Sequence, residues 1–195
     1  MKSTLTNMIL SLGTITVVAA ALLAGVYTMT EKPIKAAALN KQIEAISAVT
    51  PQFDNDPVAE AVDITPEGES TPLKVFPAKK DGQLVGAAVE SYSLAGFSGE
   101  IKLIYGFDID GNITGYEVMS HAETPGLGAK MGEWFRSPEG KRNVIGLNPA
   151  TTNMTVAKDG GDIDAITAAT ITSRAFLDAL TRAHKAYSKL AADNK

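Results

Sequence analysis

Residues 164–173 read Asp-Ala-Ile-Thr-Ala-Ala-Thr-Ile-Thr-Ser and decide how the carboxy-terminal part of the chain folds, because they open a long predicted helix. The helix is indicated by apolar residues three and four positions apart, which form one buried face. These residues are Ala175, Phe176, Ala179, Leu180, Ala183 and Tyr187. Since the first N–H groups of a helix have no partner within it, a helix start favours an anion such as phosphate.

The side chains at this helix start suit a bound phosphate group. Ala168 and Ala169 are small enough to let a bulky group approach the backbone, and the hydroxyl of Thr170 could bind a phosphate or be esterified to one. An ordinary helix cap is the alternative interpretation, because Ser and Thr are common at the N-cap position. From the residues alone, the ordinary helix cap is the favoured interpretation.

Two hairpins are predicted upstream of this helix. Residues 100–109 alternate between apolar and polar side chains, and residues 113–121 return after a turn at Asp110-Gly111-Asn112. The residues expected on one face of the first of these strands are Ile101, Leu103, Tyr105, Phe107 and Ile109. Residues 73–76 and 84–92 are consistent with a second hairpin through Lys80-Asp81-Gly82. A short helix over residues 129–136 and a strand over residues 154–158 complete an α+β fold, an antiparallel sheet with flanking helices.

The loop after the second predicted hairpin strand reads His-Ala-Glu-Thr-Pro-Gly-Leu-Gly-Ala-Lys over residues 121–130. Two glycines and a proline predict an exposed loop of defined shape with backbone N–H groups free to bind. Gly126 and Gly128 do not belong to a dinucleotide-binding fingerprint, because Met131 stands where the third glycine would be required. Taken alone, the two glycines favour a structural turn.

The amino-terminal segment is predicted to cross a membrane. Residues 8–29 carry no charge and have apolar side chains all round a helix, and at about 1.5 Å per residue they span a hydrocarbon core of about 30 Å. A cleaved signal peptide is the competing interpretation. It is disfavoured because the apolar run is long and no small-x-small site closes it. A buried soluble helix is the third possibility.

Four segments follow from these patterns. Residues 1–7 form a tail, residues 8–29 the transmembrane helix, residues 30–72 a linker helix and connecting segment, and residues 73–195 the main domain. Within the linker, we expect a helix from Pro33 to Ser47 that starts after a break at Pro33 and ends before Pro51.

Composition excludes several classes of function. A net charge of −4 without a run of Lys or Arg gives no basic surface for nucleic acid. The chain has no Cys, which excludes thiol-ligated iron–sulfur clusters, disulfides and cysteine nucleophiles. His121 and His184 lie far apart, so we expect no metal site. Redox chemistry would therefore need an organic cofactor or a metal held by oxygen and nitrogen.

The stretch 164–173 resembles the flavinylation motif of the FMN-binding domain family, written D-x-x-[ST]-G-A-[ST], with Ala168 where Gly is usual. The phrase Glu-Thr-Pro-Gly-Leu-Gly over residues 123–128 matches the second signature of that family. With both signatures in this order behind a single span, the whole chain resembles the G subunits of the Rnf electron-transport complexes. The related C subunits of the sodium-pumping NADH:quinone reductases are usually longer.

The resemblance implies a site and a cofactor. FMN would be attached through a phosphoester to Thr170 by a separate FMN transferase that uses FAD and magnesium. Side chains near the phosphate would be Thr167, Ala169, Thr172 and Ser173. Thr124, Gly126 and Leu127 would contact the flavin ring, and Glu123 would order the loop or tune the flavin.

The resemblance also implies a place in a larger assembly. The chain would be a carrier in a complex with other Rnf subunits, which passes electrons between ferredoxin and NAD and moves sodium ions or protons across the membrane. Counting Lys2 against Lys32, Lys35 and Lys41 would place the main domain in the cytoplasm. The resemblance implies the periplasmic or outer side of the bacterial inner (cytoplasmic) membrane, which we adopt. Two alternatives are a membrane-anchored assembly module without cofactor and a sensory FMN-binding module.

Overall fold

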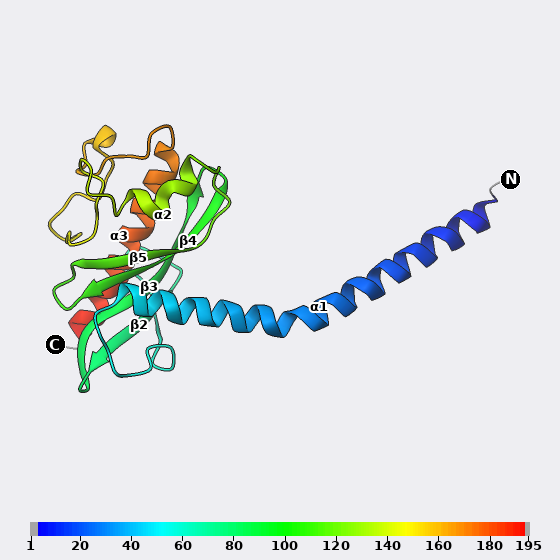
Figure 1. Ribbon diagram of the computed structural model, residues 1–195, viewed down its shortest axis with the longest axis horizontal. Helices are drawn as coiled ribbons and strands as arrows, with labels where there is room; N and C mark the ends of the chain where they lie inside the picture. The colour runs from blue at the N-terminus through cyan, green and yellow to red at the C-terminus, as the bar shows by residue number, and fades with distance from the viewer. Residues whose placement is uncertain (1–3, 194–195) are drawn as a thin grey trace. The chain divides into compact units, whose positions relative to one another are not determined.

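The computed structural model describes residues 4–193, which form two compact units, one up to Gln42 and one from Ile43 onward. The helix α1 (Leu5–Val49) runs from the first unit into the second (Figure 1). The second unit contains all the strands and the remaining helices.

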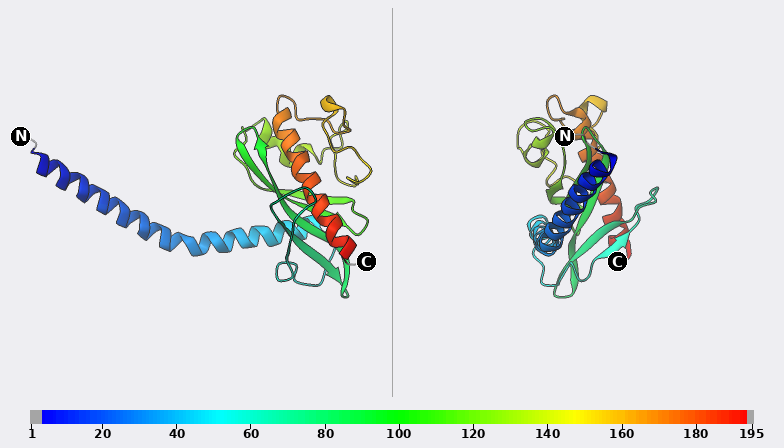
Figure 2. Two further views of the ribbon diagram at one scale, coloured as in Figure 1. Left: turned by 180° about the vertical axis from the view of Figure 1, so that it is seen from behind. Right: turned by 90° about the vertical axis from the view of Figure 1, so that its right-hand side faces the viewer.

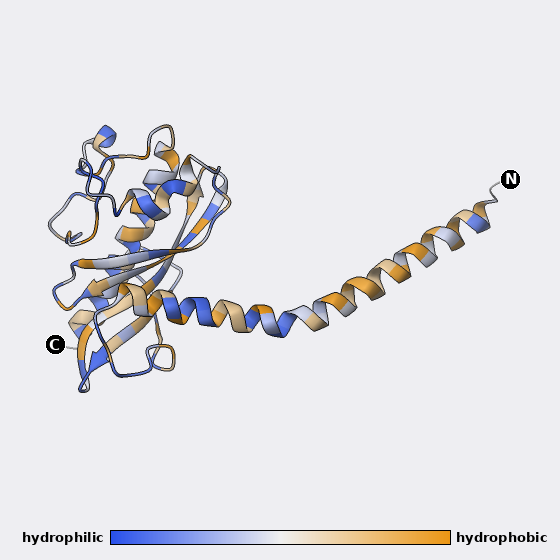
Figure 3. Cartoon of the chain, viewed as in Figure 1, coloured by the Kyte–Doolittle hydropathy of each residue, from blue (hydrophilic) through white to orange (hydrophobic). Residues whose placement is uncertain are grey.

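The first unit consists of the longer part of α1. Its large apolar side chains are exposed, among them Ile9, Leu12, Ile15 and Leu22. Figure 3 shows this apolar stretch in orange and the more polar stretch that follows it along the helix in blue. Among the residues that the structure describes, α1 is the helix whose length and composition suffice to cross a membrane.

The predicted break at Pro33 is wrong, because α1 is continuous through this residue. Pro33 lacks the N–H that would bond the carbonyl of Met29, so the helix loses one backbone hydrogen bond. The neighbouring residues include Lys35 and three consecutive alanines at 36–38, which are strong helix formers and sustain the helix on the carboxy-terminal side. The end of the helix at Val49, before Pro51, agrees with the prediction.

The second unit is built on a five-stranded antiparallel sheet whose strands lie in chain order (Figure 1). They are β1 (Val62–Ile64), β2 (Leu73–Lys80), β3 (Gln83–Gly96), β4 (Gly99–Asp108) and β5 (Ile113–Ser120). Asp81 and Gly82 join β2 to β3 with φ values of 52° and 76°, as a two-residue hairpin turn of this kind requires. Both predicted hairpins and the α+β class are confirmed.

Several local predictions differ from the structure. The segment 54–72 contains the edge strand β1, and β3 runs on to Gly96, where a tight turn leads directly into β4. Residues 154–158 form no strand: Val156 makes an isolated bridge to Ile163, and the 3-10 turn η2 (Ala157–Asp159) follows. Gly160, with a φ of 88°, then reverses the chain too early for a strand to continue. Ile109 lies beyond the end of β4 and is exposed.

The sheet is buried on both faces, which explains why its strands do not simply alternate. One face packs against the long helix α3 (Thr170–Asp193), which crosses it in Figure 2. The other face packs against the last turns of α1 through Ala45, Ile46 and Val49. Residues next to each other in a strand, such as Val75 and Phe76, are therefore both buried.

Between the sheet and α3 the chain forms two short helical pieces in place of the single helix predicted over residues 129–136. The 3-10 turn η1 (Gly128–Lys130) leads directly into α2 (Met131–Trp134). Phe135 at its end is fully buried and stacks on Phe176 of α3, with ring centroids 4.1 Å apart. This packing fixes the end of the 121–130 loop against the start of α3.

Candidate functional site: a pocket at the start of α3

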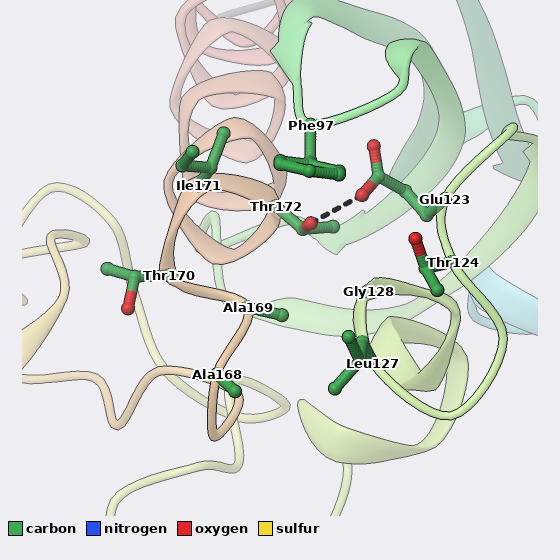
Figure 4. A pocket seen from close by; sticks show the side chains of 10 residues that line it. All are labelled: Phe97, Glu123, Thr124, Leu127, Gly128, Ala168, Ala169, Thr170, Ile171 and Thr172. Carbon is green, nitrogen blue, oxygen red and sulfur yellow. Dashed lines mark hydrogen bonds between the residues drawn. The ribbon is translucent and has the colours of Figure 1, made fainter.

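Three segments that are distant in sequence meet at one end of the domain and enclose a pocket of about 310 Å³. They are the tip of the β3–β4 hairpin, the loop after β5 and the start of α3 (Figure 4). Its lining residues are Phe97, Glu123, Thr124, Leu127, Gly128, Ala168, Ala169, Thr170, Ile171 and Thr172. The volume lies at the lower end of the range of small-molecule sites, as expected for a pocket that holds part of a ligand.

The start of α3 presents free hydrogen-bond donors to this pocket. The carbonyl of Ala169 accepts the first helical bond, from the N–H of Ser173 at 3.1 Å, so Thr170 is the first residue inside the helix. Across residues 4–193, no acceptor is found for the N–H groups of Thr170, Ile171 and Thr172, and the Thr170 hydroxyl forms no hydrogen bond. The hydroxyl of Thr170 therefore does not cap the helix.

The backbone before Thr170 is held in an uncommon conformation. Ala168 has a φ of 61°, in the left-handed region that residues with a Cβ rarely adopt. Glycine enters this region without strain, which is the physical reason for a glycine at this place in the motif D-x-x-[ST]-G-A-[ST]. Ala168, which stands where the motif usually has Gly, therefore adopts the backbone conformation of the motif but is strained in it.

Two polar side chains of the motif hold this turn in place. The Ser173 hydroxyl accepts a hydrogen bond from the N–H of Ile166 at 2.9 Å and donates one to the carbonyl of Ala169 at 3.0 Å. The side-chain carboxylate of Asp164 accepts a hydrogen bond of 2.8 Å from the backbone N–H of Lys141. The backbone carbonyl of Asp164 accepts one of 3.0 Å from the indole N–H of Trp134. Asp164 and Ser173 therefore fix the position of the turn from both ends.

Glu123 joins the three walls of the pocket although only 4% of its surface is exposed. Its Oε2 accepts a hydrogen bond of 2.6 Å from the hydroxyl of Thr172 in α3. Its Oε1 accepts one of 3.0 Å from the N–H of Ser98 in the β3–β4 turn. Figure 4 shows Glu123 and Thr172 directed toward each other at the centre of the pocket.

Large apolar side chains stand exposed around the pocket. Phe97 is 67% exposed, Ile171 47% and Leu127 41%. Single exposed apolar residues are ordinary, but three that line one pocket from three different segments form an apolar wall for a ligand. Thr170 lines the same pocket, and its side chain points away from Glu123 in Figure 4.

A charged pair lies one helical turn after Thr170. Arg174 donates two hydrogen bonds to the carboxylate of Asp159, of 2.6 and 2.8 Å. These hydrogen bonds lower the pKa of Asp159 and raise that of Arg174. Among the described residues, no group of three His, Asp or Glu side chains could hold a metal ion.

Six of the nine residues that sequence analysis assigned to the cofactor line the pocket. They are Glu123, Thr124, Leu127, Ala169, Thr170 and Thr172. Gly126, Thr167 and Ser173 are not among its lining residues. Gly126 has open space around it and a φ of 76°, Thr167 is exposed in the turn, and the Ser173 hydroxyl is buried and serves the turn.

Phe97 and Ile171 line the pocket but were not predicted from the sequence, and Gly128 was predicted without a binding role. The signal for Phe97 was its position between Gly96 and Gly99, since an aromatic residue in a tight glycine turn has little core to enter. Gly128 is needed for space: a Cβ there would lie 2.5 Å from Oε2 of Glu123 and 2.6 Å from Oγ1 of Thr172.

The fold and the pocket define an FMN-binding domain. The family model of that description matches residues 96–185, a range that holds every residue lining the pocket. The residues present fit the cofactor, with unpaired N–H groups and a free hydroxyl for its phosphate and an apolar wall for its ring.

Similar proteins extend the match to the whole chain. The G subunit of the ion-translocating oxidoreductase complex of Methanosarcina acetivorans is 38% identical over 178 residues, which cover 90% of each chain. The proteins of the same name from Aliivibrio fischeri and Yersinia pestis are 34% and 37% identical, over 94% and 85% of this chain and 90% and 81% of theirs. The chain belongs to this family of G subunits. Its apolar helix α1 agrees with a membrane-anchored protein.

Proposed function

We propose that this chain is an electron-carrier subunit that holds FMN through a phosphoester to Thr170, within a complex that transfers electrons between ferredoxin and NAD and moves sodium ions or protons. The observation that carries the proposal is that the Thr170 hydroxyl has no hydrogen-bond partner in the described part of the chain. It lies beside three N–H groups that are unpaired within the same range, and Thr170 lines an apolar pocket. A residue that served only the fold would use this hydroxyl in a cap or turn.

The attachment reaction needs a donor of the FMN phosphate. With FAD as donor, the oxygen of Thr170 forms a new bond to the phosphorus of the FMN half. The bond from that phosphorus to the bridging oxygen breaks, AMP leaves, and the hydroxyl proton is released. A separate FMN transferase with bound magnesium would catalyse this exchange. The unpaired N–H groups of Thr170, Ile171 and Thr172 favour the negative charge that the phosphate keeps afterwards.

The pocket then positions the ring. When bound, the isoalloxazine of FMN supplies the ability to accept and donate single electrons, which suits a carrier. Leu127, Phe97 and Ile171 offer apolar surface to the ring, and Thr124 lies on the same loop. Thr167, Ala169 and Thr172 lie within three residues of Thr170 in the chain, and we infer that they lie near the phosphate. Gly126 and Ser173 would act through the shape of the backbone. The covalent bond would keep the cofactor from being lost.

We assign the remaining segments in the same way. Residues 8–29 of α1 would be a retained transmembrane helix. Of the tail predicted over residues 1–7, residues 1–3 lie outside the described range, and α1 already begins at Leu5. The predicted linker 30–72 contains the end of α1 and β1, which pack with the sheet, so the domain predicted over residues 73–195 begins before residue 73. This domain would lie on the periplasmic or outer side of the inner membrane. Because the chain has no Cys, a single Cys introduced at the exposed Lys185 gives a clean topology test with a membrane-impermeant maleimide. Labelling in intact spheroplasts supports the outer side, and labelling only after lysis contradicts it.

Thr170→Val tests the attachment against Thr170→Ser, which keeps a hydroxyl at the same place. The full chain is produced together with an FMN transferase, and flavin fluorescence in a denaturing gel is read with the intact mass. We expect a fluorescent band heavier by one FMN less one water for the wild type and a weaker one for Thr170→Ser, and no fluorescence for Thr170→Val. A dark wild-type band of unmodified mass would instead favour the assembly module without cofactor. A fluorescent Thr170→Val band would move the attachment to another residue.

A further inference from the structure

The carboxylate of Glu123 is unusual in this domain because it is buried without a cation. It is the one charged side chain among the buried residues of the described range 4–193. Within that range, none of the ion pairs of the chain includes Glu123. Its partners are the N–H of Ser98 and the hydroxyl of Thr172, which are neutral donors. Burying a carboxylate with neutral partners alone costs free energy, and a Gln of the same shape would avoid most of that cost.

The surroundings of this carboxylate are shaped to keep it in place. A Cβ at Gly96 would lie 2.8 Å from Oε1, and a Cβ at Gly128 would lie 2.5 Å from Oε2. Two backbone segments therefore pass so close that only glycine fits beside the carboxylate. With both oxygens bonded and both sides enclosed, the carboxylate has one position, and that position is in the pocket wall between Phe97 and Leu127 (Figure 4).

We propose that the carboxylate of Glu123 is a fixed negative charge that lowers the reduction potential of the flavin in this pocket. The inference rests on the proposed function in one respect, that the flavin ring occupies the pocket. Adding electrons to a ring beside a fixed carboxylate brings like charges together in a partly desolvated site, where their repulsion is only weakly screened. The oxidised form is thereby favoured, and electrons are passed on to the next carrier more readily.

The test separates the charge of Glu123 from its shape. Glu123→Gln keeps the length of the side chain and removes the charge, whereas Glu123→Asp keeps the charge and is too short to reach both donors. Glu133→Gln is the matched control, because it removes the same charge from an exposed position in α2 outside the pocket lining. The midpoint potential of the flavin is measured by spectroelectrochemistry on the full chain in detergent, at low and at high salt.

We expect Glu123→Gln to make the midpoint potential more positive at both salt concentrations, because a buried charge is little screened by ions. Glu133→Gln should shift it slightly at low salt and not at high salt. Glu123→Asp should keep a potential closer to that of the wild type while lowering the melting temperature. An unchanged potential in a flavin-loaded Glu123→Gln variant overturns the inference and leaves Glu123 as a structural residue.

A second variant keeps the test decisive if Glu123→Gln takes up no flavin. Thr172→Val removes one donor and leaves the carboxylate less neutralised, so it should shift the potential in the negative direction, opposite to Glu123→Gln. A shift in the positive direction, or none, contradicts the proposed charge effect. If the proposed function is wrong, the wild type itself carries no flavin. That result is distinct from any shift, or lack of shift, in the potential of the Glu123 and Thr172 variants.

Discussion

The hydroxyl of Ser173 accepts a hydrogen bond of 2.9 Å from the backbone N–H of Ile166, seven residues earlier in the chain. The same hydroxyl donates to the carbonyl of Ala169 at 3.0 Å, and Ser173 is fully buried. One side chain inside α3 thus closes the turn that precedes Thr170. The geometry of the proposed attachment site depends on a residue that is not itself in the pocket.

Ser173→Ala is therefore expected to destabilise the domain by about 1–3 kcal/mol, because it leaves the buried N–H of Ile166 without a partner. At this chain length the melting temperature should fall by about 2–4 °C per kcal/mol. Flavin attachment should also decrease, since the turn before Thr170 loosens. Thermal unfolding of the full chain in detergent checks the first expectation and gel fluorescence the second. Ser188→Ala, at an exposed position of the same helix, is the control and should change neither quantity.

Ala168→Gly is expected to stabilise the chain despite the greater flexibility of glycine. At a φ of 61°, a residue with a Cβ is strained by roughly 1–2 kcal/mol in the folded state, and glycine removes this strain. Glycine also gives the unfolded chain more conformational entropy, which lowers the stability by about 0.4–1 kcal/mol. The difference between the middle values of these two ranges is about 0.8 kcal/mol in favour of glycine, which should appear as a higher midpoint in urea unfolding. Ala165→Gly, where φ is not positive, should lower the midpoint. If both substitutions lower it equally, Ala168 is not strained.

The two motifs assigned to the cofactor could be found in the sequence because they are local. Residues 123–128 and 164–173 are each continuous, and six of the predicted residues line one pocket. The resemblance implies that both segments meet at one cofactor, and the structure places them in one pocket; the contacts between distant segments that bring them together are not visible in any periodicity. Phe97 reaches the pocket because β3 runs to Gly96 and turns tightly into β4, a hairpin that its small and polar residues did not indicate.

Gly126 and Gly128 have different surroundings in the structure. A Cβ at Gly126 would meet no protein atom within 4 Å, and this residue takes a left-handed φ of 76° that the turn requires, so its contact with the flavin ring stays a prediction. Close packing within the protein occurs at Gly128, against Glu123 and Thr172. The two glycines look equivalent in the sequence because their difference lies in residues from another part of the chain.

Gly106 is also required because of residues distant in the sequence, here on the face of the sheet that packs against the end of α1. A Cβ at Gly106 would lie 1.8 Å from the backbone oxygen of Val49, at the end of α1, and that oxygen also accepts a hydrogen bond from Thr114. Because the obstacle is backbone, Gly106→Ala should cost about 1–3 kcal/mol through overpacking. The melting temperature in detergent should fall accordingly. Gly132→Ala, whose Cβ would meet only a methyl group at 3.9 Å, is the control and should be tolerated. Equal melting temperatures for the two variants would show that α1 does not pack tightly here.

His184 should make the stability of the domain fall in mild acid. Its ring lies against Phe107 and Tyr187, with centroids 5.6 and 6.3 Å away, and burial lowers its pKa from the usual 6.5. Below about pH 6.5 the unfolded chain binds a proton that the folded domain does not yet bind. The stabilisation is thus complete above pH 6.5 and is lost as the pH falls toward the lowered pKa of the folded state.

Removing the imidazole isolates this contribution from that of the carboxylates, which also titrate in acid. His184→Gln should have a melting temperature that depends less on pH than that of the wild type, with the two curves parallel above about pH 6.5 and converging below it. Differential scanning calorimetry on both full chains in detergent, from about pH 5 to about pH 8, gives this comparison. Curves that stay parallel through the whole range would mean that His184 titrates alike in the folded and unfolded chains.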